Sequence, residues 1–255
     1  IWQKILADLK PFADWVERVS LPIIGEPLID KRLEAKIRDL KGIGIKHVDL
    51  TCNASLMTEK RARSLLEAGL DAIDFSIDGA TKETFDKIRI RLDYNVCRDN
   101  ILSFLKARNE LKPSVPVRVR MTVWEENAHE FGAFREFWKS VLGPIDQVYG
   151  KAIHNWGNWR SDLTPENAAT DEVLNTQPCL STWVILNIFS DGRVPLCCVD
   201  FNAKHQLGDV RKASLAEIWR GSAAQRVRHL HQQLGRNGME NCKNCFAWEQ
   251  SLKIT

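Results

Sequence analysis

Four cysteines in the C-terminal third have the order and spacing of metal ligands. Cys242 and Cys245 are separated by two residues, so one short turn can present two thiolates. Cys179 and Cys197 flank or end a segment, residues 183–198, in which two β-rich runs surround Ser-Asp-Gly, and Asp-Gly is a favoured hairpin turn. Because a hairpin brings its two ends together, we expect the four thiols to converge on one centre.

Four soft thiolates favour zinc or an iron–sulfur cluster over hard cations. The spacing fits a structural zinc site that holds a loop-rich region together, and it fits a [4Fe–4S] cluster equally well; unliganded thiols are a third reading. Cys198 follows Cys197 directly and could replace it as a ligand. Cys52 and Cys97 are isolated, and a free cysteine commonly packs as a small buried apolar residue.

Composition limits the class of protein. The 255 residues are 44% hydrophobic and 27% charged, which is ordinary for a globular protein with one large domain or a domain plus a small one. A net charge of +3 without a run of Lys or Arg argues against a nucleic-acid partner. No apolar stretch is long enough to span a membrane and no signal peptide is present, so we expect a cytoplasmic protein. Seven cysteines in a reducing cytoplasm favour metal or redox chemistry over disulfides.

The elements that must position such chemistry alternate along the first half of the chain. Short β-rich runs are separated by amphipathic helical segments, which predicts a parallel sheet with helices outside it. In such α/β folds, ligands bind at the carboxyl ends of the strands. We expect strands at residues 20–24, 46–51, 71–78, 115–123 and 146–150, and helices at 27–42, 58–69, 81–88, 100–112 and 130–143.

The pattern changes near residue 155. A polar stretch rich in turn residues follows and is typical of a linker. The hairpin signal and a helical stretch at residues 214–234 then lead to the last two cysteines. We therefore divide the chain into residues 1–155, a linker at 156–176, and a metal-binding region at 177–255.

This C-terminal region resembles the SPASM-type extension of radical S-adenosylmethionine (radical SAM) enzymes. That extension has a cysteine, then a glycine followed at the fifth position by a cysteine, then a CxxC. Cys179, Gly192 with Cys197, and Cys242 with Cys245 match this order. The resemblance implies that the four cysteines bind an auxiliary [4Fe–4S] cluster, with Cys197 preferred to its neighbour because of its distance from the glycine.

The first half resembles the radical SAM barrel independently. "IIGEPLID" is similar to the family's GGEPLL stretch, whose backbone receives the ammonium group of S-adenosylmethionine (SAM). Gly25 and Glu26 match it, and Ile24 replaces the family's first glycine. "TCNASLMTE" is similar to a TNG stretch after the next strand, with Asn53 matching and Ala54 in place of the glycine.

The stretch "DFSIDGATKETFDKIR" is similar to the family's following strand and helix. The resemblance implies that Ser76 and Arg89 bind the SAM carboxylate and that Asp78 shapes the turn. Arg118 and Arg120 alternate with valines, so both side chains lie on one face of a strand. Inside a barrel such arginines need a partner, for example a carboxylate of SAM or of substrate, and we place Arg120 among the SAM-binding residues; the alternative is an edge strand with solvated arginines.

One departure from the family is large. The CxxxCxxC loop that holds the SAM-cleaving cluster is not found in these residues. In the family this loop precedes the first helix, and residues 1–10 have the pattern of that helix. We therefore expect the first strand and the CxxxCxxC loop upstream of residue 1; a protein without them would bind rather than cleave SAM.

The resemblance implies a partial (β/α)6 TIM-like barrel of the radical SAM type with a small C-terminal β-hairpin and helix metal-binding extension. It implies an enzyme that cleaves SAM reductively and abstracts a hydrogen atom from an organic substrate, a small sugar or amino-alcohol or a peptide, with an auxiliary [4Fe–4S] cluster assisting electron transfer. A reductant such as flavodoxin or ferredoxin is the expected partner, and nucleic acid and membrane are not. The alternatives are a zinc-stapled α/β binding protein and a degenerate radical SAM scaffold.

Overall fold

The structure is a computed structural model that describes residues 1–22, 24–157, 159–163 and 172–247. By contacts, the chain divides into two compact units. One unit, here the barrel unit, is Phe12–Ala152. The other, here the cysteine unit, consists of Ile1–Pro11 and Ile153–Thr255.

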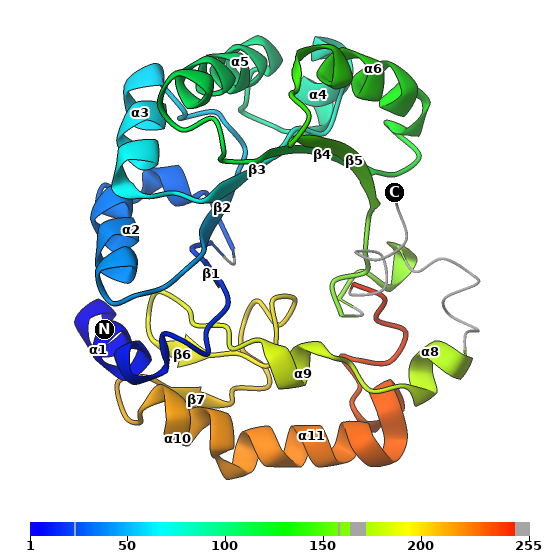
Figure 1. Ribbon diagram of the computed structural model, residues 1–255. Helices are drawn as coiled ribbons and strands as arrows, with labels where there is room; N and C mark the ends of the chain where they lie inside the picture. The colour runs from blue at the N-terminus through cyan, green and yellow to red at the C-terminus, as the bar shows by residue number, and fades with distance from the viewer. Residues whose placement is uncertain (23, 158, 164–171, 248–255) are drawn as a thin grey trace. The chain divides into compact units, whose positions relative to one another are not determined.

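The barrel unit is built on one parallel sheet whose strand order follows the sequence. Figure 1 shows the sheet as a curved arc. The fold class predicted from the alternation of elements is thereby confirmed. The strands are β1 (Val19–Ser20), β2 (Val48–Cys52), β3 (Ala72–Ser76), β4 (Val117–Val123) and β5 (Gln147–Ala152).

The helices of this unit connect successive strands and lie along the outer side of the arc (Figure 1). They are α2 (Leu33–Gly42), α3 (Glu59–Ala68), α4 (Lys82–Ile88), α5 (Tyr94–Leu111) and α6 (Phe131–Val141).

The ends of α3 are where the sequence predicts them. The Thr58 hydroxyl accepts a hydrogen bond from the backbone N–H of Arg61 at 3.2 Å, which satisfies one of the free donors of the first turn. Gly69 ends the helix with φ of +101°, a conformation that costs glycine little.

The first predicted strand is shorter than expected. Only Val19 and Ser20 pair with β2, against Val48 and Asp49. Further along, Gly25 has φ of +89°, which is incompatible with an extended strand and turns the backbone into a loop.

The two faces of the sheet differ in chemistry because side chains alternate along each strand. On β4, Val117, Val119 and Met121 are fully buried, whereas Arg118 and Arg120 are partly exposed. The buried set belongs to an apolar layer between sheet and helices that includes an edge-to-face pair of Phe75 and Phe104, with ring centroids 5.3 Å apart. The arginines therefore lie on the face that the helices leave uncovered.

The cysteine unit contains short elements and one small antiparallel sheet. The elements are α1 (Trp2–Leu9), α8 (Glu172–Thr176), α9 (Ser181–Val184), β6 (Arg193–Val194), β7 (Gly208–Asp209), α10 (Leu215–Arg220) and α11 (Ser222–Leu234).

The predicted hairpin is only partly correct. A tight turn does occur at Ser-Asp-Gly, closed by a hydrogen bond from the Phe189 N–H to the Arg193 carbonyl at 2.8 Å. The strand after the turn, β6, pairs with β7 rather than with the run before it. Gly192 has φ of +94°, and a side chain there would meet Arg211 and Asp209 at 3.2–3.3 Å, so β7 packs where a preceding strand was expected.

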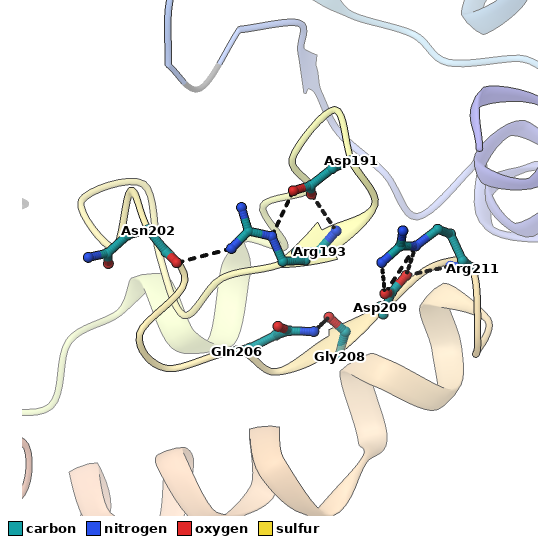
Figure 2. Close-up of polar contacts among 7 residues, drawn as sticks. All are labelled: Asp191, Arg193, Asn202, Gln206, Gly208, Asp209 and Arg211. Carbon is teal, nitrogen blue, oxygen red and sulfur yellow. Dashed lines mark hydrogen bonds and ion pairs between the residues drawn. The ribbon is translucent and has the colours of Figure 1, made fainter.

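Charged side chains fasten this turn, as Figure 2 shows. Asp191 accepts hydrogen bonds from the backbone N–H of Arg193 at 3.0 Å and from its Nε at 2.7 Å. Arg193 Nη1 also donates to the Asn202 carbonyl at 3.1 Å, and Arg211 pairs with Asp209 on β7. The turn and the loop toward β7 are therefore held by one set of polar contacts.

Helix α1 belongs to the cysteine unit. Ile5 packs in an apolar cluster with residues of β6, α10 and their connections, including Val194 and Ile218. Lys4 donates to the Ala213 carbonyl at 3.0 Å. These contacts explain why residues 1–11 group with the C-terminal part, whereas the sequence-based division had assigned residues 1–155 to one region.

None of the helices in the described part of the chain is long and apolar enough to cross a membrane.

Candidate cofactor sites

Glu26 ties the loop after β1 to the end of β2. Its Oε2 accepts a hydrogen bond from the backbone N–H of Asn53 at 2.8 Å, and its Oε1 accepts one from Leu28 at 3.0 Å. Burial raises the pKa of Glu26, although these hydrogen bonds and the charge of Arg89 oppose the rise. Next to it, Gly25 has no atom within 4 Å of the position a Cβ would take, so its backbone is accessible.

Arg89 joins the ends of the next two strands. Its Nη2 donates to the Ser76 hydroxyl at 2.8 Å and forms an ion pair with Asp78. Asp78 in turn accepts a hydrogen bond from the backbone N–H of Thr122 at 2.7 Å. The Nε of Arg89 is buried and has no hydrogen-bond partner in the structure, which leaves a donor of this guanidinium available.

Asn53 shapes the end of β2. Its Oδ1 accepts hydrogen bonds from the backbone N–H of Ser55 at 3.0 Å and from the Ser55 hydroxyl at 2.7 Å. This local turn lets the following residue, Ala54, adopt φ of +64°. Six of the seven residues expected at the SAM site thus lie along one edge of the sheet: Gly25, Glu26, Asn53, Ser76, Asp78 and Arg89.

Sequence reasoning missed the residue that orients α4. Glu130 accepts hydrogen bonds from the N–H of Ala80 at 2.7 Å, the hydroxyl of Thr81 at 2.6 Å and the hydroxyl of Thr84 at 2.7 Å. These groups lie in the first turn of α4 and just before it, and the last turn of α4 leads to Arg89. The helix dipole favours a carboxylate at a helix N-terminus. Glu130 lies about fifty residues further along the chain than α4, so no local sequence pattern indicates this contact.

A second group that the sequence did not reveal lies on the uncovered face of the sheet. Asp74 is buried between two arginines, at 3.3 Å from Arg118 Nε and 3.5 Å from Arg120 Nε. Tyr149 donates its hydroxyl to Asp74 Oδ2 at 2.7 Å. Burial raises the pKa of Asp74, and burial followed by the charge of Asp74 raises that of Tyr149.

This group decides one alternative left open by the sequence. Strand β4 lies between β3 and β5, so the reading of an edge strand with solvated arginines is wrong. Arg120 lies beside Ser76 in the strand register, but its observed ionic partner is Asp74.

The four cysteines expected as ligands line one cavity in the cysteine unit. The cavity holds about 490 Å³ of empty space, part of it open to solvent. Cys198 is not among the described residues that line it, which favours its neighbour Cys197 as the ligand. The lining includes Cys179, Cys197, Cys242 and Cys245, with Arg236 and Asp200.

The thiols influence one another electrostatically, as neighbouring sulfurs must. Burial raises the pKa of Cys242 to about 12, and the nearby Cys245 and Cys179 add to the rise. Burial likewise raises the pKa of Cys245 to about 11 and that of Cys197 well above its ordinary value. Thiolates in such surroundings need the positive charge of a metal centre to be stable.

The CxxC turn has a defined backbone. Cys245 N–H donates to the Cys242 carbonyl at 3.0 Å, and Asn244 between them adopts φ of +58°. Asparagine tolerates this left-handed conformation better than most residues. On the other side of the cavity, the N–H of Cys179 donates to His231 Nδ1 at 3.1 Å, so that the backbone of this cysteine is also fixed.

The donor set consists of four soft thiols that line one cavity. Four cysteines around a common cavity are the ligand set of a [4Fe–4S] cluster, whose four irons are spread over a cube. A tetrahedral zinc site would need the four sulfurs about 2.3 Å from one point.

Comparisons with known proteins agree with both halves of this description. The model of the radical SAM superfamily matches residues 2–137, which is more than half of the chain. The model of the SPASM domain, an iron–sulfur cluster-binding domain, matches residues 179–246. The chain therefore belongs to the radical SAM superfamily and carries a SPASM domain, and membership implies SAM and [4Fe–4S] clusters as cofactors.

Individual relatives have low sequence identity to this chain. An uncharacterized protein of Treponema pallidum is 26% identical over 252 residues, which cover 91% of this chain and 67% of that protein. A probable GTP 3',8-cyclase of Methanothermobacter thermautotrophicus is 28% identical over 155 residues, which cover 58% of this chain and 49% of that one. The chain thus spans about two thirds and about half of these relatives.

Solved structures show the same fold at low identity. BtrN in complex with AdoMet and 2-DOIA has a TM-score of 0.60 and 17% identity, covering 96% of this chain and 78% of BtrN. Native anSMEcpe with bound AdoMet and the Kp18Cys peptide has a TM-score of 0.62 and 15% identity, covering 95% and 80%. These likenesses establish the architecture alone.

Proposed function

We propose that this chain is the core of a radical SAM enzyme that cleaves SAM reductively and abstracts a hydrogen atom from an organic substrate. The observation that carries the proposal is the common cavity lined by four cysteines, in a chain whose sheet edge carries the family's SAM-binding residue types. When bound, the SAM-cleaving cluster and SAM supply the hydrogen-abstracting radical.

In this proposal the sheet edge binds the amino-acid part of SAM. The accessible backbone at Gly25 and Glu26 receives the ammonium group, with Glu26 held by Asn53. Arg89 and Ser76 bind the carboxylate, because a guanidinium gives a strong charge-assisted hydrogen bond. The ion pair with Asp78 holds Arg89 in place before SAM arrives, so less conformational entropy is lost on binding.

Cys179, Cys197, Cys242 and Cys245 would bind the auxiliary [4Fe–4S] cluster. The cluster would accept or relay an electron during oxidation, epimerisation or crosslinking of the substrate. The residues of this chain contribute geometry: the CxxC turn fixes two sulfurs, and His231 fixes the backbone of Cys179.

The substrate is proposed to be a small molecule or a peptide. Support comes from proteins with the same fold, which hold 2-DOIA in one case and peptides in others. A flavodoxin or ferredoxin as reductant and a cytoplasmic location stay predictions.

The test is the metal content of the anaerobically purified chain. We expect about four iron and four sulfide per chain on the cysteine unit, with a visible absorption that dithionite bleaches. Stoichiometric zinc without iron would contradict the proposal and favour the zinc-stapled binding protein.

SAM binding separates an enzyme from a degenerate scaffold. We expect equilibrium dialysis to show one SAM per cluster-loaded protein and dithionite to yield 5′-deoxyadenosine when the CxxxCxxC loop is present. Full iron loading with the loop present, but without cleavage of SAM, would support the scaffold instead.

A further inference from the structure

Two guanidinium groups on the inner, uncovered face of the sheet share one carboxylate. Arg118 and Arg120 both approach Asp74 through Nε, at 3.3 and 3.5 Å. Asp49, a further carboxylate on this face, already pairs with Arg18 at 3.3 Å. The group therefore carries an excess positive charge.

The hydrogen-bond inventory of this group is incomplete. The Nε atoms of Arg118 and Arg120 and Oδ1 of Asp74 are buried and have no hydrogen-bond partner among the residues that the structure describes. Their distances to one another are at or near the limit for a hydrogen bond. Folded proteins rarely leave buried donors unsatisfied, and two like charges on one face of a strand repel each other. A bound anion would satisfy these donors and reduce the repulsion between the two arginines.

The two arginines are nevertheless positioned and reachable. Their side chains are 35% and 25% exposed, whereas Asp74 is 7% exposed. Tyr149 on β5, the strand beyond β4, donates its hydroxyl to Asp74 at 2.7 Å and so holds the carboxylate. The carboxylate thus anchors the Nε ends, and the forked ends of both guanidiniums remain for another acceptor.

The position relates this group to the proposed SAM site. Ser76, which binds Arg89, pairs in register with Arg120 on the neighbouring strand. A molecule held by the arginines would therefore lie on the inner face of the sheet, next to the edge where SAM is proposed to bind.

We propose that Arg118 and Arg120 form a binding site for an oxyanion, a carboxylate or phosphate group of the substrate. The planar fork of arginine matches both groups by paired hydrogen bonds. The assignment of this oxyanion to the substrate rests on the proposed function, whereas the binding of an oxyanion by the two arginines does not. The substrate class is thereby narrowed to anionic molecules or peptides with an acidic group near the reacting carbon.

The test uses inorganic phosphate and acetate as probes with the full, cluster-loaded chain. Binding is measured by isothermal titration calorimetry, and SAM binding is measured separately on the same samples. We expect R118Q and R120Q each to raise the Kd for the preferred probe at least about tenfold, with R135Q as the exposed matched control on α6. The better of the two probes identifies the group as phosphate or carboxylate.

A variant that is expected to lower the Kd for the probe distinguishes loss of the site from misfolding. D74N removes the competing negative charge, so we expect it to lower the Kd about threefold or more. A misfolded variant could not bind the probe more tightly. Unchanged affinity in R118Q, R120Q and D74N would overturn the oxyanion site.

SAM binding and iron content report on the proposed function and not on this site. Loss of SAM binding in all proteins, with phosphate or acetate binding that still follows the arginines, would overturn the proposed function alone. A further outcome is that SAM, added first, abolishes probe binding and that R120Q raises the Kd for SAM. In that case the oxyanion would be the SAM carboxylate, and the substrate assignment would be wrong.

Discussion

Asn175 and Asn244 are joined by two hydrogen bonds in opposite directions. Asn175 Nδ2 donates to Asn244 Oδ1 at 2.7 Å, and the backbone N–H of Asn244 donates to Asn175 Oδ1 at 2.6 Å. Asn175 lies in α8, and Asn244 lies inside the CxxC turn. The pair therefore fixes the turn that presents two of the proposed cluster ligands.

Replacing Asn175 by alanine should loosen this turn. The N–H of Asn244 would lose its acceptor, which costs about 1–3 kcal/mol for a buried donor. We expect N175A to lose iron faster than wild type during dialysis against a chelator. N95A changes an exposed asparagine of α5 and serves as the control. Equal rates of iron loss in both variants would show that the pair does not support the turn.

Cysteine substitutions distinguish the two neighbouring thiols. Because Cys197 lines the cavity, C197A should lose most cluster iron and the visible absorption. C198A should keep both. C97A tests a buried thiol of the barrel unit and should also keep them. The reverse result, iron lost in C198A and retained in C197A, would move the ligand by one position.

Arg89 should control SAM affinity. R89Q removes the charge that pairs with Asp78 and would bind the SAM carboxylate, so we expect the Kd for SAM to rise at least about tenfold. R89K keeps the charge without the fork and should fall between R89Q and wild type. Equilibrium dialysis at matched iron content measures this. A Kd for R89Q equal to that of R135Q would remove Arg89 from the site.

The pH dependence of stability should show the buried pair of Arg108 and Asp146. Asp146 accepts two hydrogen bonds from Arg108, at 2.8 and 2.6 Å, and further ones from the N–H groups of Val117 and Gly143. Burial alone would raise the pKa of Asp146, but these hydrogen bonds outweigh it and hold the pKa below its ordinary 3.8. The pair therefore stabilises the folded state fully above about pH 4 and less as pH falls through the lowered pKa.

Removing the carboxylate leaves Arg108 buried without its partner. We expect D146N to lower the free energy of unfolding by about 3–5 kcal/mol at pH 7. The difference from wild type should shrink below pH 4, measured by urea unfolding at several pH values. D14N, at an exposed position, changes the net charge equally and should leave the curve unchanged. A difference that is constant down to pH 3 would contradict the assignment.

The sequence indicated those site residues whose position follows from a general rule. Glu26, Asn53, Ser76 and Asp78 lie at or beyond the carboxyl ends of strands, and the carboxyl ends of parallel strands share one edge. Their grouping could therefore be expected. Which atoms they contact could not, because those contacts depend on side-chain rotamers and on loop backbones such as that of Gly25.

Other parts required the register of the sheet. Asp74 lies in the middle of a strand in which acidic residues recur every third or fourth position, so its facing arginines follow only from the pairing with β4. Tyr149 is one strand further away. The hairpin expectation failed for a related reason: β6 takes β7 as its partner, although β7 lies beyond a loop of thirteen residues (195–207) and the turn residues at 190–192 are those of a local hairpin.

The attachment of α1 has a consequence for biosynthesis. Each strand of the barrel unit pairs with its sequence neighbours, so that unit can assemble progressively while the chain is being translated. Helix α1 cannot dock in this progressive way, because Lys4 and Asp8 bind Ala213 and Leu215, about two hundred positions later. Helix α1 therefore leaves the ribosome before the barrel unit but docks only after residues 213–215 have been made, and a molecular chaperone would have a long interval in which to hold its apolar face.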